Sequence, residues 1–216
     1  MILIISQRIL LAAVILIWAG VYYFNNGNPV QRYEFKHATE QYLTEVYNDH
    51  NWNVQAIDYS FKEGDFRASV NMDGKVDFSV FGNNLDALKD NYWVSKWKNE
   101  IAKSVEEKVQ AIVGSQADVV VNILIEGSDV IQKRSNTLNY ADIANQSSTQ
   151  TTIFLKATFS PDKMDQQIFE IVQWAQNKQY HATLFFQTED DSVHIEIPAQ
   201  QLKSIQTVND LHPFIQ

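Results

Sequence analysis

The densest group of chemically reactive side chains in this sequence is the acidic run Glu189-Asp190-Asp191. Clustered carboxylate oxygens are the ligands that hard cations such as Ca²⁺ prefer. Adjacent acids in a turn point in different directions, however, and the spacing of a regular calcium-binding loop does not accompany them. We therefore interpret this run as a solvated hairpin turn and predict no metal site there.

Histidine and cysteine usage also argues against a metal or cofactor site. No two histidines stand at the spacing of helical metal ligands, and the motif H-E-x-x-H does not occur. The chain has no cysteine, which excludes disulfides, thiolate zinc sites, iron–sulfur clusters and cysteine nucleophiles. We expect no metal and no cofactor. The five histidines are His37, His50, His181, His194 and His212.

No pattern typical of covalent or acid–base catalysis is present. Ser115 and Ser128 each follow a glycine but lack the flanking glycine pattern of a nucleophile elbow. The seven glycines are dispersed, so no loop could cradle a phosphate. Asp58 and Asp65 are carboxylates that only coordinates could identify as a catalytic pair. We predict no catalytic residue, and a hydrolase with an unrecognised carboxylate site stays open.

The stretch Asp90-Asn91-Tyr92-Trp93, followed by Trp97, could stack on a sugar or clamp a peptide. The two tryptophans, however, begin an apolar stripe that continues at helical spacing through Ile101, Val105, Val109 and Ile112. This periodicity favours a buried helix face over a ligand site. We predict that Trp93 and Trp97 belong to a core.

The elements around these residues predict an α-β-β-β-α unit in the first half of the chain. Asn28-Pro29 is a typical helix start, and apolar residues recur at helical spacing to about Asn48. The apolar period then changes to two over residues 54–80, with Asp73-Gly74 as a type I′ hairpin turn. A long helix follows from Leu85 to about Val113, and Gly114 ends it.

The second half predicts a β-β-α-β-β unit. Strands are expected over 118–126, 151–159, 180–188 and 193–197, with a helix after Ser160-Pro161. The polar stretch 128–150 is expected to be a connection with a short helical turn near Tyr140 to Ala144. The fold class is therefore α+β, with an anchor at 1–24 and subdomains at 25–114 and 115–216.

The run from Ile9 to Phe24 carries no charge and no strongly polar side chain. Crossing a bilayer takes about 20 apolar residues, and this run alone is slightly short. Arg8 precedes the run and aromatic residues crowd its end, as at a membrane interface. We predict a retained single-pass transmembrane helix with a cytoplasmic N-terminus and an extracytoplasmic remainder; a cleaved signal peptide is the alternative.

The net negative charge of the chain argues against a nucleic acid partner. The chain carries a formal net charge of −9, spread without a long acidic run. Phosphate backbones bind basic surfaces, so we expect no nucleic acid partner.

Several of these features together resemble a known class of proteins. The features are Tyr42 and Tyr47 on a helix, the meander Tyr59 to Phe81, and the stretch Asp90 to Trp97. They resemble small single-pass envelope proteins of Gram-positive bacteria whose function is not assigned, and the helix-then-meander order is similar to cystatin-like and PepSY-like domains. The resemblance implies an inhibitory or regulatory binding role and assigns no site residue.

We therefore expect a membrane-anchored, non-enzymatic module of the cell envelope that binds a protein or a peptide. Two alternatives stay open: a cell-wall or peptide hydrolase, and a structural subunit of a membrane complex. Converging acids of raised pKa in a cleft would favour the hydrolase.

Overall fold

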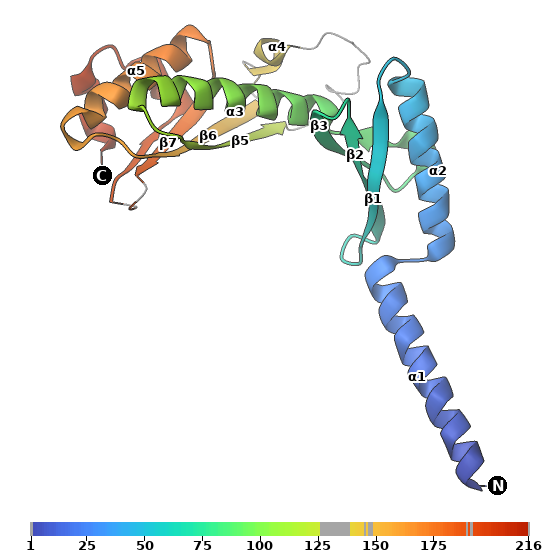
Figure 1. The fold of residues 1–216 in the computed structure, drawn as a ribbon. Helices are drawn as coiled ribbons and strands as arrows, with labels where there is room; N and C mark the ends of the chain where they lie inside the picture. Colours follow the sequence, from blue (N-terminus) through green and yellow to red (C-terminus); the bar gives the residue numbers. More distant parts are fainter. Residues whose placement is uncertain are drawn as a thin grey trace. The chain divides into compact units, whose positions relative to one another are not determined.

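The computed structural model describes residues 2–125, 139–144, 146, 149–188, 190 and 192–215 of the chain (Figure 1). It has an α+β fold with two separate four-stranded sheets. The chain divides into two compact units, residues 1–92 and 93–216. The sequence placed the division at Gly114, whereas the structure places it at the first residue of a long helix.

The first unit contains two helices and an antiparallel sheet. Its strand order is β1-β2-β3-β4, with all three neighbouring pairs antiparallel. The elements are α1 (Ile2–Asn26), α2 (Pro29–Val46), β1 (Trp52–Ser60), β2 (Asp65–Met72), β3 (Val76–Phe81), a 3-10 turn η1 (Leu85–Ala87) and β4 (Lys89–Asp90).

Helix α2 begins where the sequence predicted. The side chain of Asn28 accepts a hydrogen bond from the backbone N–H of Val30, and Pro29 occupies the first helical position. Its inward face buries Phe35, Thr39 and Leu43, and the ring of Phe35 lies 5.8 Å from that of Phe66 on β2. One face of the sheet is thus covered by α2.

The hairpin turn between β2 and β3 also confirms its prediction. Asp73 and Gly74 have φ angles of 55° and 67°, the two positive values that a type I′ turn requires. Strands β2 and β3 pair from Met72 with Val76 to Arg67 with Phe81. The turn therefore sets the register of the meander.

The long helix predicted from Leu85 begins later in the structure. Residues 85–87 form the 3-10 turn, capped by the side chain of Asn84, and Lys89 and Asp90 then pair with Phe81 and Val80. Pairing with β3 keeps the chain extended until helix α3 begins at Tyr92. A tertiary contact thus overrides the local helical pattern.

The predicted transmembrane anchor at Ile9 to Phe24 is wrong. Among the residues that the structure describes, no helix is both long enough and apolar enough to cross a membrane. Crossing takes about 20 consecutive apolar residues, and the uncharged run inside α1 falls short of that length. The transmembrane helix in the predicted fold, the single-pass topology and the membrane localisation, which all rested on this anchor, are therefore wrong as well.

The second unit places two long helices against one face of its sheet. The strand order is β5-β6-β7-β8, in which β6 and β7 are parallel and the other pairs are antiparallel. The elements are α3 (Tyr92–Val113), β5 (Asp118–Ile125), α4 (Tyr140–Ala144), β6 (Thr149–Ala157), a 3-10 turn η3 (Pro161–Lys163), α5 (Met164–Asn177), β7 (Ala182–Thr188), β8 (His194–Ile197), α6 (Ala199–Leu202) and a 3-10 segment η4 (Val208–Phe214).

The core of this unit lies between the sheet and helices α3 and α5. The apolar stripe predicted for α3 is confirmed: Trp97, Ile101, Val105 and Val109 are buried among residues of α5 and the four strands. Burying a large apolar side chain stabilises a fold by about 2 kcal/mol. This face of the sheet is therefore closed, and the strands turn their alternate side chains the other way.

Candidate functional site

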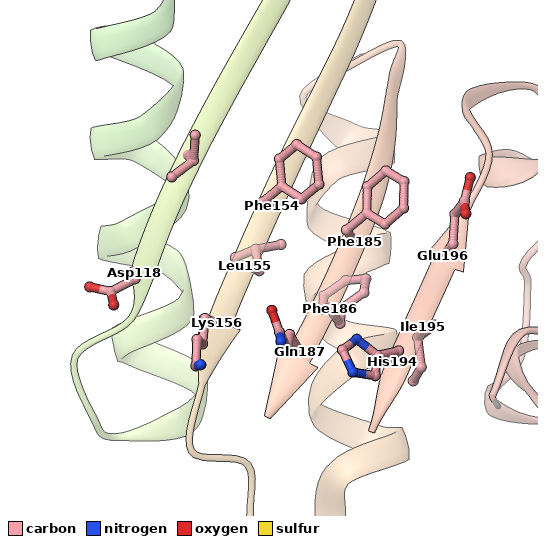
Figure 2. A pocket seen from close by; sticks show the side chains of 11 residues that line it. Asp118, Phe154, Leu155, Lys156, Phe185, Phe186, Gln187, His194, Ile195 and Glu196 are labelled. Atoms are coloured by element: carbon pink, nitrogen blue, oxygen red, sulfur yellow. The ribbon is translucent and has the colours of Figure 1, made fainter. Parts of the chain in front are cut away.

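The face of sheet β5–β8 that points away from the core is the main candidate surface of the second unit. In Figure 2 the helices lie behind the strands, and the labelled side chains of Phe154 and Phe185 stand in front of them. Along β5 the alternation is plain: Val121 is buried in the core, whereas Val120 and Leu124 are 55% and 66% exposed. Exposed apolar side chains thus gather on one face.

The registers of the three strand pairs join these outward-facing residues into rows that cross the sheet. An apolar row with an acid at one end consists of Val120, Phe154, Phe185 and Glu196. The neighbouring row is polar and consists of Asp118, Lys156, Gln187 and His194. Each row takes one residue from each strand.

The centre of the apolar row is a stacked aromatic pair. The rings of Phe154 and Phe185 are nearly parallel, at 15°, and their centroids lie 4.8 Å apart. This separation equals the usual distance between neighbouring strands, so the rings stack across β6 and β7. Phe154 is 41% exposed. The pair therefore presents aromatic surface to solvent rather than to the core.

The two rows border a groove of about 450 Å³ (Figure 2). Its lining includes the two phenylalanines, Asp118, Lys156 and Glu196. Small-molecule and peptide sites typically combine apolar walls with a few polar groups that fix orientation. The groove has this composition.

The acids in the groove do not form a catalytic pair. Asp118 lies on edge strand β5 and Glu196 on edge strand β8, three strand spacings away. Three spacings amount to about 14 Å, whereas glycosidase carboxylates stand roughly 5 to 9.5 Å apart. The groove thus lacks the geometry that the alternative of a carboxylate hydrolase requires.

Asp58 and Asp65 do not stand directly opposite each other on strands β1 and β2. The register partner of Asp58 on β2 is Arg67, and that of Asp65 is Ser60. Arg67 also lies over the ring of Phe81, 5.6 Å from its centroid. The residue opposite Asp58 is thus a basic one, and its guanidinium is directed toward β3.

The D-N-Y-W stretch holds the first unit together. Oδ2 of Asp90 accepts hydrogen bonds from the hydroxyls of Tyr42, at 2.6 Å, and Tyr47, at 2.9 Å. Oδ1 of Asp90 accepts from the backbone N–H of Tyr92, and Oδ1 of Asn91 accepts from the N–H of Ser79. These contacts tie α2 and β3 to β4.

The two tryptophans take the place predicted for them. Trp97 is 2% exposed in the core of the second unit, and the half-buried ring of Trp93 packs 6.0 Å from it. The ammonium of Lys96 lies 4.9 Å from the centroid of the Trp93 ring. Neither ring lines the groove.

The acidic turn is only partly described by the structure. Glu189 and Asp191 lie outside the described residues. Asp190 accepts hydrogen bonds from the N–H and the hydroxyl of Ser192. The hydroxyls of Thr188 and Ser192 lower the pKa of Asp190 to about 2. Hydrogen bonds within the turn thus hold this carboxylate.

The histidines have different surroundings in the structure. His50 contacts the carboxylate of Asp73 at 2.8 Å, His194 lines the groove, and burial lowers the pKa of His181. Throughout the described ranges, no three acidic or histidine side chains lie close enough to hold a metal ion.

Sequence reasoning missed the aromatic pair, although a signal for it exists. Ile153-Phe154-Leu155 and Leu184-Phe185-Phe186 are apolar at three consecutive positions. A strand with one wet face alternates apolar and polar residues, so an unbroken run indicates apolar surface on both faces. Phe154 and Phe185 are the outward members of these runs.

One comparison with known proteins gives a match. Residues 4–91 are similar to the family described as the YfjL-like, N-terminal domain. The match ends next to the boundary of the first unit at Tyr92. It carries no statement about PepSY-like or cystatin-like domains or about Gram-positive proteins. No curated protein and no solved structure matches the chain.

Proposed function

We propose that this chain is a non-enzymatic binding protein, and that the open face of sheet β5–β8 holds an extended segment of a protein or peptide. The observation that carries the proposal is the stacked pair Phe154–Phe185 on the exposed side of a sheet whose other side is a closed core. Contiguous apolar surface of this kind marks interaction sites in folded proteins.

The groove suits a polypeptide because it is open along the sheet and combines apolar with polar walls. Val120 and Phe154 are exposed side by side at one end of the apolar row. Lys156 and His194 belong to the polar row beside it. Aromatic residues dominate the binding energy of protein interfaces, and charged rim residues fix the register of the partner. The groove supplies both elements.

A regulatory role is the more specific form of this proposal. The order of helix and meander in residues 29–81 resembles PepSY-like and cystatin-like domains, which implies restraint of a partner protein. This likeness concerns the first unit and names no residue of the groove.

Selection of random displayed peptides on the immobilised full chain tests the proposal. The same selection on a Phe154→Ser/Phe185→Ser double variant shows which peptides need the groove. We expect a consensus sequence on the unchanged chain that the double variant loses. Leu85→Ser is the matched control, because Leu85 is 41% exposed in the first unit, like Phe154 in the second. Equal enrichment on all three proteins would refute the proposal.

A further inference from the structure

We propose that the groove selects an arginine side chain, whose guanidinium stacks on Phe185 and pairs with the carboxylate of Glu196. This inference rests on the proposed function and names the chemistry of the segment that the groove holds. It further places an apolar side chain of the same segment, two positions from the arginine, against Val120 and Phe154.

The ring of Phe185 provides the first half of the arginine site. Its neighbours in the row are Phe154 on β6 and Glu196 on β8. Because Phe154 stacks on one side, the other side of the Phe185 ring is directed toward β8. A guanidinium stacks well on an aromatic face, through both its charge and its planar shape.

Glu196 provides the second half of the arginine site. Its side chain is exposed, and within the described residues its carboxylate makes no hydrogen bond or ion pair. It stands beside Phe185 in the register of β7 and β8 (Figure 2). A carboxylate next to an aromatic face can accept two parallel N–H bonds from a guanidinium, which the single ammonium of lysine cannot supply.

The charges of the groove favour a cation at this end. The lining carries two acids, Asp118 and Glu196, and one lysine, Lys156. Lys156 is the register partner of Asp118 on the neighbouring strand, whereas Glu196 lies two strands away from it on β8. The whole chain is also acidic, at −9. A phosphate backbone would be repelled, although stacked aromatics could otherwise receive bases.

The length of the apolar row sets the spacing of the segment. From β5 to β8 the row spans about 14 Å, which is about four residues of an extended chain. Side chains two positions apart point to the same side of such a chain. An apolar residue on Val120 and Phe154 therefore leaves an arginine two positions away within reach of Phe185 and Glu196.

The test is a calorimetric titration of the full chain with blocked pentapeptides of sequence Gly-Leu-Gly-Arg-Gly. Matched peptides carry lysine or the neutral arginine analogue citrulline in the arginine position. We expect citrulline to weaken binding about tenfold, since it loses both the ion pair and the cation–π contact. Lysine should fall between the two, and added salt should reduce the difference.

Variants locate the effect on Glu196. Glu196→Gln should weaken the arginine peptide about fivefold and reduce its advantage over citrulline to about twofold, because the contact with the Phe185 ring remains. Glu170→Gln is the control, because Glu170 is an exposed acid on α5, behind the sheet. It should leave all three affinities unchanged.

The outcomes separate the inference from the proposed function. Equal affinity for the arginine and citrulline peptides, with loss in Phe154→Ser/Phe185→Ser, overturns the arginine site and leaves peptide binding in place. No binding of any pentapeptide also overturns the arginine site, while the displayed-peptide selection judges the proposed function on its own. Tighter binding of a single-stranded oligothymidylate than of the arginine peptide overturns both.

Discussion

The hydroxyl of Tyr47 donates to Oδ2 of Asp90 at 2.9 Å, across 43 residues of sequence. Tyr42 donates to the same oxygen at 2.6 Å, so one carboxylate fastens helix α2 and its C-cap residue Tyr47 to β4. Burial, followed by the charge of Asp90, raises the pKa of Tyr47 well above its usual value. The hydroxyl of Tyr47 thus stays protonated and remains a donor across the ordinary pH range.

Asp90→Ala should lower the free energy of unfolding of the first unit by about 3 kcal/mol. Two tyrosine hydroxyls and the N–H of Tyr92 lose their acceptor, and each part-buried donor left without a partner costs about 1 kcal/mol. Hydrogen exchange of the β1–β3 amides measures this loss. Asp86→Ala removes the same charge from an exposed position and should cost no more than about 0.5 kcal/mol. Equal effects of the two changes would refute the role of Asp90.

Acid should weaken the first unit through Asp73. A hydrogen bond with His50, followed by one from the N–H of Asn51, lowers the pKa of Asp73 below its ordinary value of 3.8. A carboxyl whose folded pKa is lowered stabilises the fold above its unfolded pKa and loses this contribution as the pH falls through the folded pKa. The contribution is therefore complete above about pH 5 and disappears below the folded pKa.

Asp73→Asn tests this pH dependence, because asparagine tolerates the positive φ of the turn but carries no charge. Urea unfolding at a series of pH values compares the two proteins. The stability difference should be constant above about pH 5 and should change as the pH falls through the titration of Asp73. A difference that stays constant down to the lowest pH would contradict the prediction.

Gly27→Ala should destabilise the first unit by about 3 kcal/mol or more. Gly27 has φ of +69°, and an added Cβ would lie 2.8 Å from ring atoms of both Tyr59 and Phe66. The positive φ costs about 1–2 kcal/mol and the overpacking about 1–3 kcal/mol. Thermal unfolding followed by circular dichroism measures the sum.

Gly64→Ala is the matched control for Gly27→Ala. Gly64 has nearly the same φ, +72°, but nothing lies within 4 Å of the added Cβ. Only the conformational cost of about 1–2 kcal/mol should appear. If both variants lost the same stability, the close packing of Gly27 against the rings would have no energetic weight.

The neighbours Phe185 and Phe186 should respond very differently to truncation. Phe186 is 2% exposed in the core, so Phe186→Ala should cost about 3–5 kcal/mol through lost burial and an unfilled cavity. Phe185 points to the open face, and Phe185→Ala should cost only about 1 kcal/mol. Urea unfolding of the two variants measures both values. A larger loss of unfolding free energy for Phe185→Ala than for Phe186→Ala would contradict the assignment of Phe186 to the face of β7 that meets the helices.

Most of the local structure was predictable because its causes lie within a few residues of one another. The Asn28-Pro29 start of α2, the Asp73-Gly74 turn and the buried stripe of α3 each follow from a cap, a positive φ or a helical period. The short helix at Tyr140–Ala144 also lies where it was expected. The membrane span was wrong because its argument depended on the length of an apolar run that is slightly short.

The sequence by itself determined that this chain is α+β, that its first half holds a meander and its second half a β-β-α-β-β set, and that α3 has one apolar face. Only the tertiary structure decided that α3 covers β5–β8, that Asp90 accepts hydrogen bonds from Tyr42 and Tyr47, and that Phe154 stacks on Phe185. The physical reason is distance along the chain. A period or a cap acts between near neighbours, whereas the pairing of strands and helix faces depends on the register of segments tens of residues apart.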